Sequence, residues 1–311
     1  MNENNHDINN QLNPENHNPE NQNNQNKEIE IKPMKEKKTI HGEFFVTFAL
    51  IMLFFEAYLF LFHTTTPFSI SSLIIDIIYI LIFGMTLWAY FIVIRTPAGS
   101  IPLYWGFYIG DDDEKRKRYC LICNAFKPER SKHCSICNTC VLNMDHHCPW
   151  VNNCIGFFNR KYFMQFIMFL ELLFIYTFIC TPIKLIPKYK IAIETKEANY
   201  FELVILSVNY LPLLVITILF GKFVLYHIRL VLINSSTIES LDQENKDKYK
   251  KFCLSTKENF EQVFGKKKLY WFLPIINEES RPVGDGLLWK VNNDPVNLKD
   301  VNQNNNGGNN N

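Results

Sequence analysis

The sequence predicts an all-α membrane protein with four transmembrane helices and a cysteine-rich domain between the second and third helices. Two observations predict it: four strongly apolar stretches alternate with polar segments, and seven of the nine cysteines lie within residues 120–154. The net charge of +1 conceals an acidic run at residues 111–114 and a basic run at 115–118, so it indicates nothing about partners.

Residues 1–43 form the predicted N-terminal tail. Residues 1–26 are dominated by Asn with Gln, Glu and Pro, and such a composition buries too little apolar surface to offset the entropy of ordering. Residues 302–311 repeat this composition. We expect both ends to be disordered, and we expect no secretory signal because no apolar stretch lies near Met1.

Residues 44–94 are predicted to hold the first two spans. Residues 44–63 are mostly apolar and long enough to cross a bilayer as a helix at about 1.5 Å per residue. Residues 70–94 form a second apolar run in which Asp76 is the only formal charge. The linker between them carries no Lys or Arg.

Residues 163–230 are predicted to hold the other two spans. The third is expected at 163–183, and the fourth lies within 203–230, where Pro212 and Lys222 interrupt it. Residues 95–162 therefore form a domain between spans, and residues 231–311 form a C-terminal region.

The distribution of basic residues predicts the orientation. Arg95, the lysines of residues 27–38 and the basic run at 115–118 place the N-terminus and the cysteine-rich domain in the cytosol by the positive-inside rule. An even number of spans then places the C-terminus there too. The second outer loop opposes this orientation, because it is expected to contain four lysines: Lys184, Lys188, Lys190 and Lys196.

Glu56, Asp76 and Glu171 are ionisable residues inside apparent spans, where such groups are costly and often functional. The alternative, which we favour, is that they face the bundle interior, protonated or paired with Lys222 or a hydroxyl. Three scattered acids without an internal repeat do not indicate a transporter.

Residues 259–265 predict a short amphipathic helix stopped by Gly265. A lysine cluster at 266–268 and an aromatic segment at 270–274 follow, and such a combination suits a membrane interface. The alternative is that the lysine cluster is simply exposed to solvent.

The cysteine-rich domain contains paired C-x2-C motifs, which in a reducing compartment favour zinc over disulfides. Ten Cys and His ligands are available, whereas two tetrahedral sites need eight. One thiol and one imidazole remain, as a nucleophile with its own base requires. Spacing does not choose which ones remain, and an accidental surplus or a single zinc is the alternative. The tetrapeptide Asp145, His146, His147, Cys148 is expected in a bent loop rather than on a helix.

The sequence resembles the DHHC family of protein S-acyltransferases, or palmitoyltransferases. The resemblance rests on the four spans and on five motifs: C-x2-C from Cys120, H-C-x2-C-x2-C from His133, D-H-H-C-P-W from Asp145, the single Cys154, and N-R-x-Y-F from Asn159. Residues 236–239 are similar to the family's T-T-x-E element with Ser at its first position. The family's D-P-G turn is replaced by Thr96-Pro97-Ala98-Gly99.

The resemblance implies a role for each residue. Cys148 would be the nucleophile, His146 its base and Asp145 the group orienting His146. Thr237 would lie near Asp145, Trp150 would line the start of an acyl site, and Asn259 would be structural. Two structural zinc ions would be held by Cys120, Cys123, His133 and Cys140 and by Cys134, Cys137, His147 and Cys154.

The implied activity is ping-pong transfer of a long-chain acyl group, typically palmitoyl, from acyl-CoA through acyl-Cys148 to a cysteine of a substrate protein. Such substrates would present cytosolic cysteines close to the bilayer of the endoplasmic reticulum, Golgi or plasma membrane.

Two other functions compete with this one. A nucleic-acid zinc finger is excluded, because a module fixed between spans lacks a basic recognition helix and cannot reach DNA. A membrane-anchored zinc scaffold without transferase activity stays open, although it leaves Cys148 unexplained.

Overall fold

The computed structural model describes residues 40–63, 70–106, 118–195 and 200–292. The two Asn-rich tails, the lysines of residues 27–38, the linker at 64–69, the acidic run at 111–114 and Lys196 lie outside the described residues. The cysteine-rich segment at 120–154 lies without a gap inside one of the described ranges.

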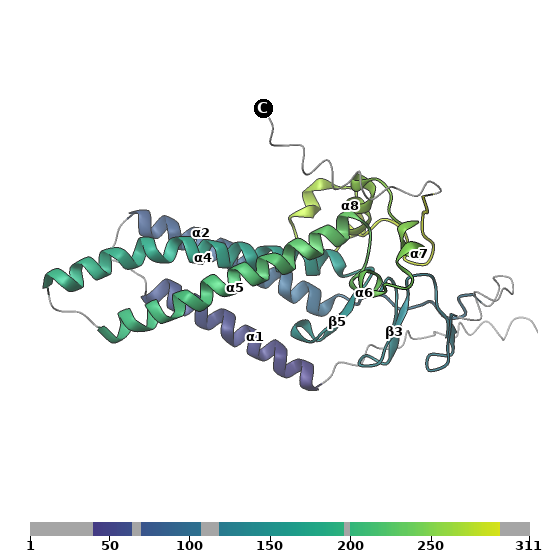
Figure 1. The fold of residues 1–311 in the computed structure, drawn as a ribbon, viewed down its shortest axis with the longest axis horizontal. Helices are drawn as coiled ribbons and strands as arrows, with labels where there is room; N and C mark the ends of the chain where they lie inside the picture. Colours follow the sequence, from purple (N-terminus) through teal and green to yellow (C-terminus); the bar gives the residue numbers. More distant parts are fainter. Residues whose placement is uncertain (1–39, 64–69, 107–117, 196–199, 293–311) are drawn as a thin grey trace, which may run out of the picture. The chain divides into compact units, whose positions relative to one another are not determined.

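Four helices of the described ranges are long and apolar enough to cross a membrane, as the sequence predicts. They are α1 (Ile40–Tyr58), which continues as the π-helical η2 (Leu59–His63), α2 (Ile70–Arg95), α4 (Arg160–Thr195) and α5 (Tyr200–Leu232). Helix α4 packs against both α2 and α5, and the cysteine-rich segment lies beyond the end of α2 (Figure 1). The fold is therefore mostly helical.

Helix α4 is longer than the predicted span at 163–183. It contains 36 residues and passes through Pro182 and Pro187, which corresponds to about 54 Å of helix, more than the roughly 30 Å of a hydrocarbon core. Lys184, Lys188 and Lys190 consequently lie on this helix. The prediction that they belong to an outer loop is wrong.

Buried Lys184 forms an ion pair with Asp76 of α2, and its Nζ atom lies 4.6 Å from the centroid of the Phe60 ring. Asp76 is thus paired with Lys184, whereas the sequence had suggested Lys222 or a hydroxyl as its partner. Glu56 accepts a hydrogen bond of 3.2 Å from Asn209, and the carboxylate of Glu171 faces Gly221. All three acids point toward neighbouring helices.

Six short strands interrupt the helical architecture of the described residues, and the expectation of an all-α fold is corrected to this extent. They form three antiparallel hairpins: β1 (Tyr119–Cys120) with β2 (Ala125–Phe126), β3 (Lys132–Cys134) with β4 (Thr139–Val141), and β5 (His146–Cys148) with β6 (Asn153–Ile155). Each strand has two or three residues, too few for an alternating pattern to be recognised. Asn124, Asn138 and Asn152, in the connections between paired strands, adopt positive φ angles of 51°, 54° and 46°, a conformation that Asn tolerates better than most residues.

Asparagine side chains attach the last hairpin to the membrane helices. Asn153 donates hydrogen bonds to the carbonyls of Val93 at 3.1 Å and Thr96 at 2.9 Å, and Asn159 donates to Thr96 at 3.1 Å. The last carbonyls of a helix have no partner within it. The β5–β6 hairpin therefore occupies the end of α2. The Thr96–Gly99 turn also contacts the cysteine-rich segment, because its Ala98 and Gly99 carbonyls accept hydrogen bonds from the backbone N–H groups of Phe158 and Leu142.

The C-terminal region folds back against the ends of α4 and α5. It contains α6 (Thr237–Leu241), α7 (Lys246–Lys250) and α8 (Thr256–Phe264), followed by the 3-10 turns η4 (Lys268–Trp271) and η5 (Glu278–Ser280). Helix α8 confirms the predicted amphipathic helix and ends at Gly265, whose φ is 79°.

Candidate active site and metal centres

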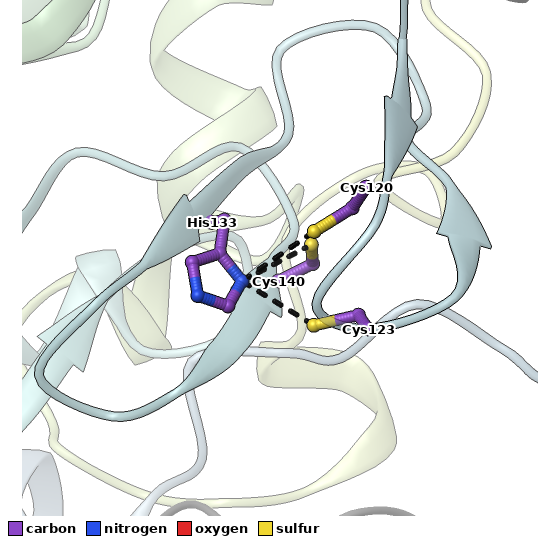
Figure 2. Close-up of side chains that lie close together, drawn as sticks. All are labelled: Cys120, Cys123, His133 and Cys140. Atoms are coloured by element: carbon purple, nitrogen blue, oxygen red, sulfur yellow. Dashed lines mark hydrogen bonds between the residues drawn. The ribbon is translucent and has the colours of Figure 1, made fainter.

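Cys120, Cys123, His133 and Cys140 form the first of two clusters of metal-ligating side chains. They come from the β1–β2 turn region and from the β3–β4 hairpin, in which His133 faces Cys140. The Nδ1 atom of His133 lies 3.6, 3.3 and 3.8 Å from the sulfur atoms of Cys120, Cys123 and Cys140 (Figure 2). The three thiols converge on one imidazole nitrogen.

Cys134, Cys137, His147 and Cys154 form the second cluster. The β5–β6 register places His147 opposite Cys154. The Nδ1 atom of His147 lies 3.8, 3.4 and 3.7 Å from the sulfur atoms of Cys134, Cys137 and Cys154.

Both clusters have the dimensions of a tetrahedral zinc site. Bonds of about 2.3 Å to sulfur and about 2.0 Å to nitrogen place the nitrogen and sulfur ligands of a tetrahedron about 3.5 Å apart. In each cluster the four ligand atoms lie within 4.8 Å of one another. The residues present therefore fit two fully ligated zinc ions, which would leave no open coordination position for a substrate.

Strand β5 separates the two adjacent histidines. Successive side chains of a strand point to opposite faces, so His147 joins the second cluster while His146 turns toward Asp145. The tetrapeptide that begins at Asp145 was expected in a bent loop. It instead leads directly into an extended strand, because pairing with β6 holds it straight.

Asp145 is the centre of the hydrogen-bond network around His146. It is fully buried, and its Oδ2 atom lies 2.7 Å from Nδ1 of His146. Thr237 donates to it twice, from its backbone N–H at 3.0 Å and from its hydroxyl at 2.8 Å. The guanidinium of Arg160 lies 3.4 Å from Oδ1. Every contact favours the ionised carboxylate.

The electrostatics follow from these contacts. Burial by itself would raise the pKa of Asp145, but the charge of Arg160 and the hydrogen bond from His146 hold it well below its usual range. Burial would likewise lower the pKa of His146, whereas its hydrogen bonds with Asp145 and Cys148 and the Asp145 charge raise that pKa to about 9. His146 is thus prepared to carry a proton beside the Cys148 thiol.

Cys148 ends strand β5 at the junction with the membrane helices. It is 7% exposed and belongs to an apolar cluster with Tyr90 and Val93 of α2 and Phe163 of α4. Tyr90 donates a 2.7 Å hydrogen bond to the carbonyl of Trp150. The thiol therefore has an imidazole on one side and apolar span residues on the other.

The turn η3 (Pro149–Val151) places Trp150 against α1. The Trp150 ring is 47% exposed and lies edge-on to Phe45, with 5.3 Å between centroids. Gly42 of α1 lies so close to Asn152 that a Cβ atom at Gly42 would come within 1.9 Å of the amide oxygen. This close approach fixes α1 beside the segment that follows Cys148.

A buried ion pair anchors α6, the helix that carries Thr237. Arg130 donates to both carboxylate oxygens of Glu239, at 2.7 and 2.8 Å, and to the side-chain and backbone oxygens of Asn234. Its guanidinium also lies 4.3 Å from the Trp289 ring centroid. Ser236 and Glu239 form a capping box that starts α6. These contacts set the position of Thr237 on Asp145.

Asn259 lies apart from this network. It donates to the carbonyl of Leu232 at 2.7 Å and accepts from the backbone of Leu254 at 2.9 Å. It therefore holds α8 to the end of α5 and has no direct part in the site.

The sequence did not indicate three residues that contact Asp145 or its neighbours. Arg160 was seen only as part of a motif, and its contact with Asp145 joins positions too far apart in the chain for spacing to reveal. Arg130 gave no signal beyond its charge. The ring of buried His227 lies 5.8 Å from that of His146, and a single histidine near the end of an apolar stretch offers no pattern to detect.

Comparison with known proteins identifies a family over part of the chain. The profile of the DHHC palmitoyltransferase family matches residues 113–244. "Probable protein S-acyltransferase 14" of Arabidopsis thaliana is 35% identical over 239 residues, which cover 68% of this chain and 75% of the relative. "Palmitoyltransferase PFA4" of Mycosarcoma maydis is 35% identical over 66% of this chain and 50% of its own length.

The human "Palmitoyltransferase ZDHHC20" is 30% identical over 68% of this chain and 56% of its own length. The matched segment contains both Cys/His clusters, the tetrapeptide Asp145–Cys148 and Thr237. The chain therefore belongs to the DHHC palmitoyltransferase family of protein S-acyltransferases.

Proposed function

We propose that this protein transfers a long-chain acyl group from acyl-CoA to cysteines of substrate proteins, with Cys148 as the nucleophile. The observation that carries the proposal is the placement of Cys148 beside His146, whose other nitrogen is held 2.7 Å from buried Asp145. A nucleophile, a base within hydrogen-bonding reach and a group orienting that base make up a catalytic triad.

The first half-reaction exchanges one thioester for another. The Cys148 thiolate attacks the thioester carbonyl carbon of acyl-CoA, a bond forms between that carbon and the Cys148 sulfur, and the bond to the CoA sulfur breaks. The proton on His146 then passes to the departing CoA thiolate. Acyl-Cys148 and free CoA are the products, and no nucleotide is consumed.

The second half-reaction releases the acyl group. His146, now neutral, accepts the proton of a substrate cysteine, whose sulfur attacks the carbonyl carbon of acyl-Cys148. A bond forms between that carbon and the substrate sulfur, the bond to the Cys148 sulfur breaks, and the Cys148 thiolate is regenerated beside protonated His146. Asp145 holds His146 in one orientation throughout, and Thr237 and Arg160 hold Asp145. The acyl chain would lie along the apolar cluster that lines Cys148 between α2 and α4, with Trp150 near its start.

The two Cys/His clusters would hold structural zinc ions. When bound, zinc would fix the β3–β4 and β5–β6 hairpins, on which His146 and Cys148 depend for their positions. The bound metal would take no part in the thioester exchange, because all four coordination positions of each ion are supplied by the protein.

We also propose that the cysteine-rich domain faces the cytosol, where acyl-CoA is available. One observation supports this orientation: Lys184, one of the basic residues that opposed it, is buried and forms an ion pair with Asp76 within the helix bundle. Substrates would be proteins whose cysteines lie close to the same membrane surface.

The experiment is labelling of the purified protein with an acyl-CoA analogue, compared among the wild type, Cys148→Ser and Cys134→Ser. We expect hydroxylamine-sensitive labelling of the wild type and none of Cys148→Ser, which keeps two zinc ions. Cys134→Ser should lose zinc together with labelling. If Cys148→Ser is labelled as strongly as the wild type, the nucleophile is another residue; if nothing is labelled although two zinc ions are bound, the domain is a scaffold.

A further inference from the structure

A groove lies between the end of α5 and the short helices α6 and α7. It has a volume of about 680 Å³ and does not include Cys148, His146 or Asp145. This volume falls within the range of about 300–1,000 Å³ that is typical of sites for small organic ligands. The proposed acyl-transfer reaction makes no use of this groove.

The polarity of the groove changes along the direction of α5. Leu225 and Ile228 line it within the candidate span, and exposed Leu241 of α6 faces the same space. Arg229 follows in the last turn of α5, and Lys246 and Lys250 of α7 line the part beyond the end of the span. An apolar wall that becomes cationic where a span ends has the order of polarity of a phospholipid, from acyl chain to headgroup.

The free charge of the groove is positive. Among the described residues, Arg229 and Lys246 have no ion-pair partner, and Lys250 pairs only with exposed Asp247 at 2.6 Å. Glu239 is the one carboxylate of the lining, and it is buried and accepts hydrogen bonds from Arg130. Asp242, near the rim, accepts from Asn245 and Tyr249. Arg229 and Lys246 are therefore the cations of the lining that no described carboxylate pairs with.

We propose that this groove binds an anionic glycerophospholipid of the surrounding membrane. Arg229, Lys246 and Lys250 would meet the phosphate and headgroup, and an acyl chain would lie along Leu225, Ile228 and Leu241. A protein partner is less suited, because one wall of the groove belongs to α5, a helix long and apolar enough to cross a membrane, beside which lipid is the expected neighbouring molecule. The site is separate from the acyl-transfer function and does not depend on it.

The groove shares α6 with the active site. Ser240 and Glu239 line the groove from α6, and Thr237 of the same helix holds Asp145. A lipid bound there would contact the helix that positions the catalytic carboxylate, so it would stabilise the conformation in which Thr237 meets Asp145.

The test uses the full-length protein in nanodiscs of phosphatidylcholine that contain a trace of a photoactivatable phosphatidylserine. Crosslinked peptides are identified by mass spectrometry, and unlabelled phosphatidylserine, phosphatidylcholine or CoA is added as a competitor. The variant is R229Q/K246Q. Its matched control, K257Q/R281Q, removes two exposed positive charges outside the groove.

We expect crosslinks within residues 225–253 that unlabelled phosphatidylserine suppresses and phosphatidylcholine does not. In R229Q/K246Q the apparent affinity should fall about 30-fold, because each cation near a membrane surface contributes about a factor of five. The control double variant should resemble the wild type.

Three results would overturn the proposal: equal labelling of this segment by a phosphatidylcholine probe, unchanged labelling in R229Q/K246Q, or suppression by CoA, which would make the groove a CoA site. None of these readouts depends on acyl transfer, so failure here leaves the assignment of Cys148 untouched.

Discussion

Thr237 and Asp145 are joined by two hydrogen bonds although 92 positions separate them, one from the backbone N–H at 3.0 Å and one from the hydroxyl at 2.8 Å. Each carboxylate oxygen of Asp145 therefore accepts one hydrogen bond from Thr237, and Oδ2 also lies within hydrogen-bonding distance of His146. The orientation of the base is thus set by a helix from the C-terminal region and not by the cysteine-rich domain alone.

Thr237→Val should slow autoacylation about tenfold. The substitution keeps the backbone bond and the shape but removes a hydroxyl bond to a carboxylate, and a hydrogen bond to a charged group contributes about 1.5–3 kcal/mol. Thr237→Ser should restore most of the rate. The measurement is the rate of acyl-Cys148 formation under single-turnover conditions, together with zinc content, which should stay at the wild-type level. A Val variant as fast as the wild type would show that the hydroxyl is dispensable.

Arg130→Lys should destabilise the protein strongly. Lysine keeps the charge but cannot donate to both oxygens of buried Glu239, and each hydrogen bond to a charged group that is lost costs about 1.5–3 kcal/mol. The readout is the thermal unfolding midpoint in detergent. Lys251→Gln is the matched control, because Lys251 forms an ion pair with Glu129 at a partly exposed site and should shift the midpoint little. Equal shifts in the two variants would contradict the anchoring role of Arg130.

Zinc binding and acyl transfer should be lost independently of each other in suitable variants. Cys123→Ala should reduce the zinc content from two to about one per chain, because three ligands remain in the first cluster. His146→Ala should keep both zinc ions and lose autoacylation. The measurement is elemental analysis of the purified variants beside acyl-CoA labelling. Loss of zinc in His146→Ala would mean that His146, and not His147, is a ligand.

The ion pair between Asp76 and Lys184 should be needed for folding of the helix bundle. Asp76→Leu alone leaves a buried ammonium group without its partner and should lower the yield of folded protein markedly. Asp76→Leu/Lys184→Met removes both charges and should recover most of it. Lys190→Gln, at an exposed position of α4, serves as the control. Yield is measured as monodisperse protein after detergent extraction. If the double variant is no better than Asp76→Leu, the pair has a role beyond mutual neutralisation.

The four membrane helices and the surplus of one Cys and one His could be predicted from the sequence. The contacts between segments that are distant in the chain could not. Runs of apolar residues predict spans directly, and ten ligands for eight positions indicate that one Cys and one His are free. The end of α4 could not be predicted because Pro182 and Pro187 usually mark boundaries, yet the helix continues through both. Asp145 with Arg160 and Arg130 with Glu239 are formed only by packing, and their residues carry no pattern that links them.

Asn153 links the strand that carries Cys148 to the end of helix α2. It lies opposite Cys148 in the β5–β6 hairpin and binds the last carbonyls of α2, so the reactive sulfur has a fixed height relative to the bilayer. We therefore expect that such an enzyme selects a cysteine by the length of chain between that cysteine and the substrate's own membrane anchor, and that it tolerates varied residues around the cysteine.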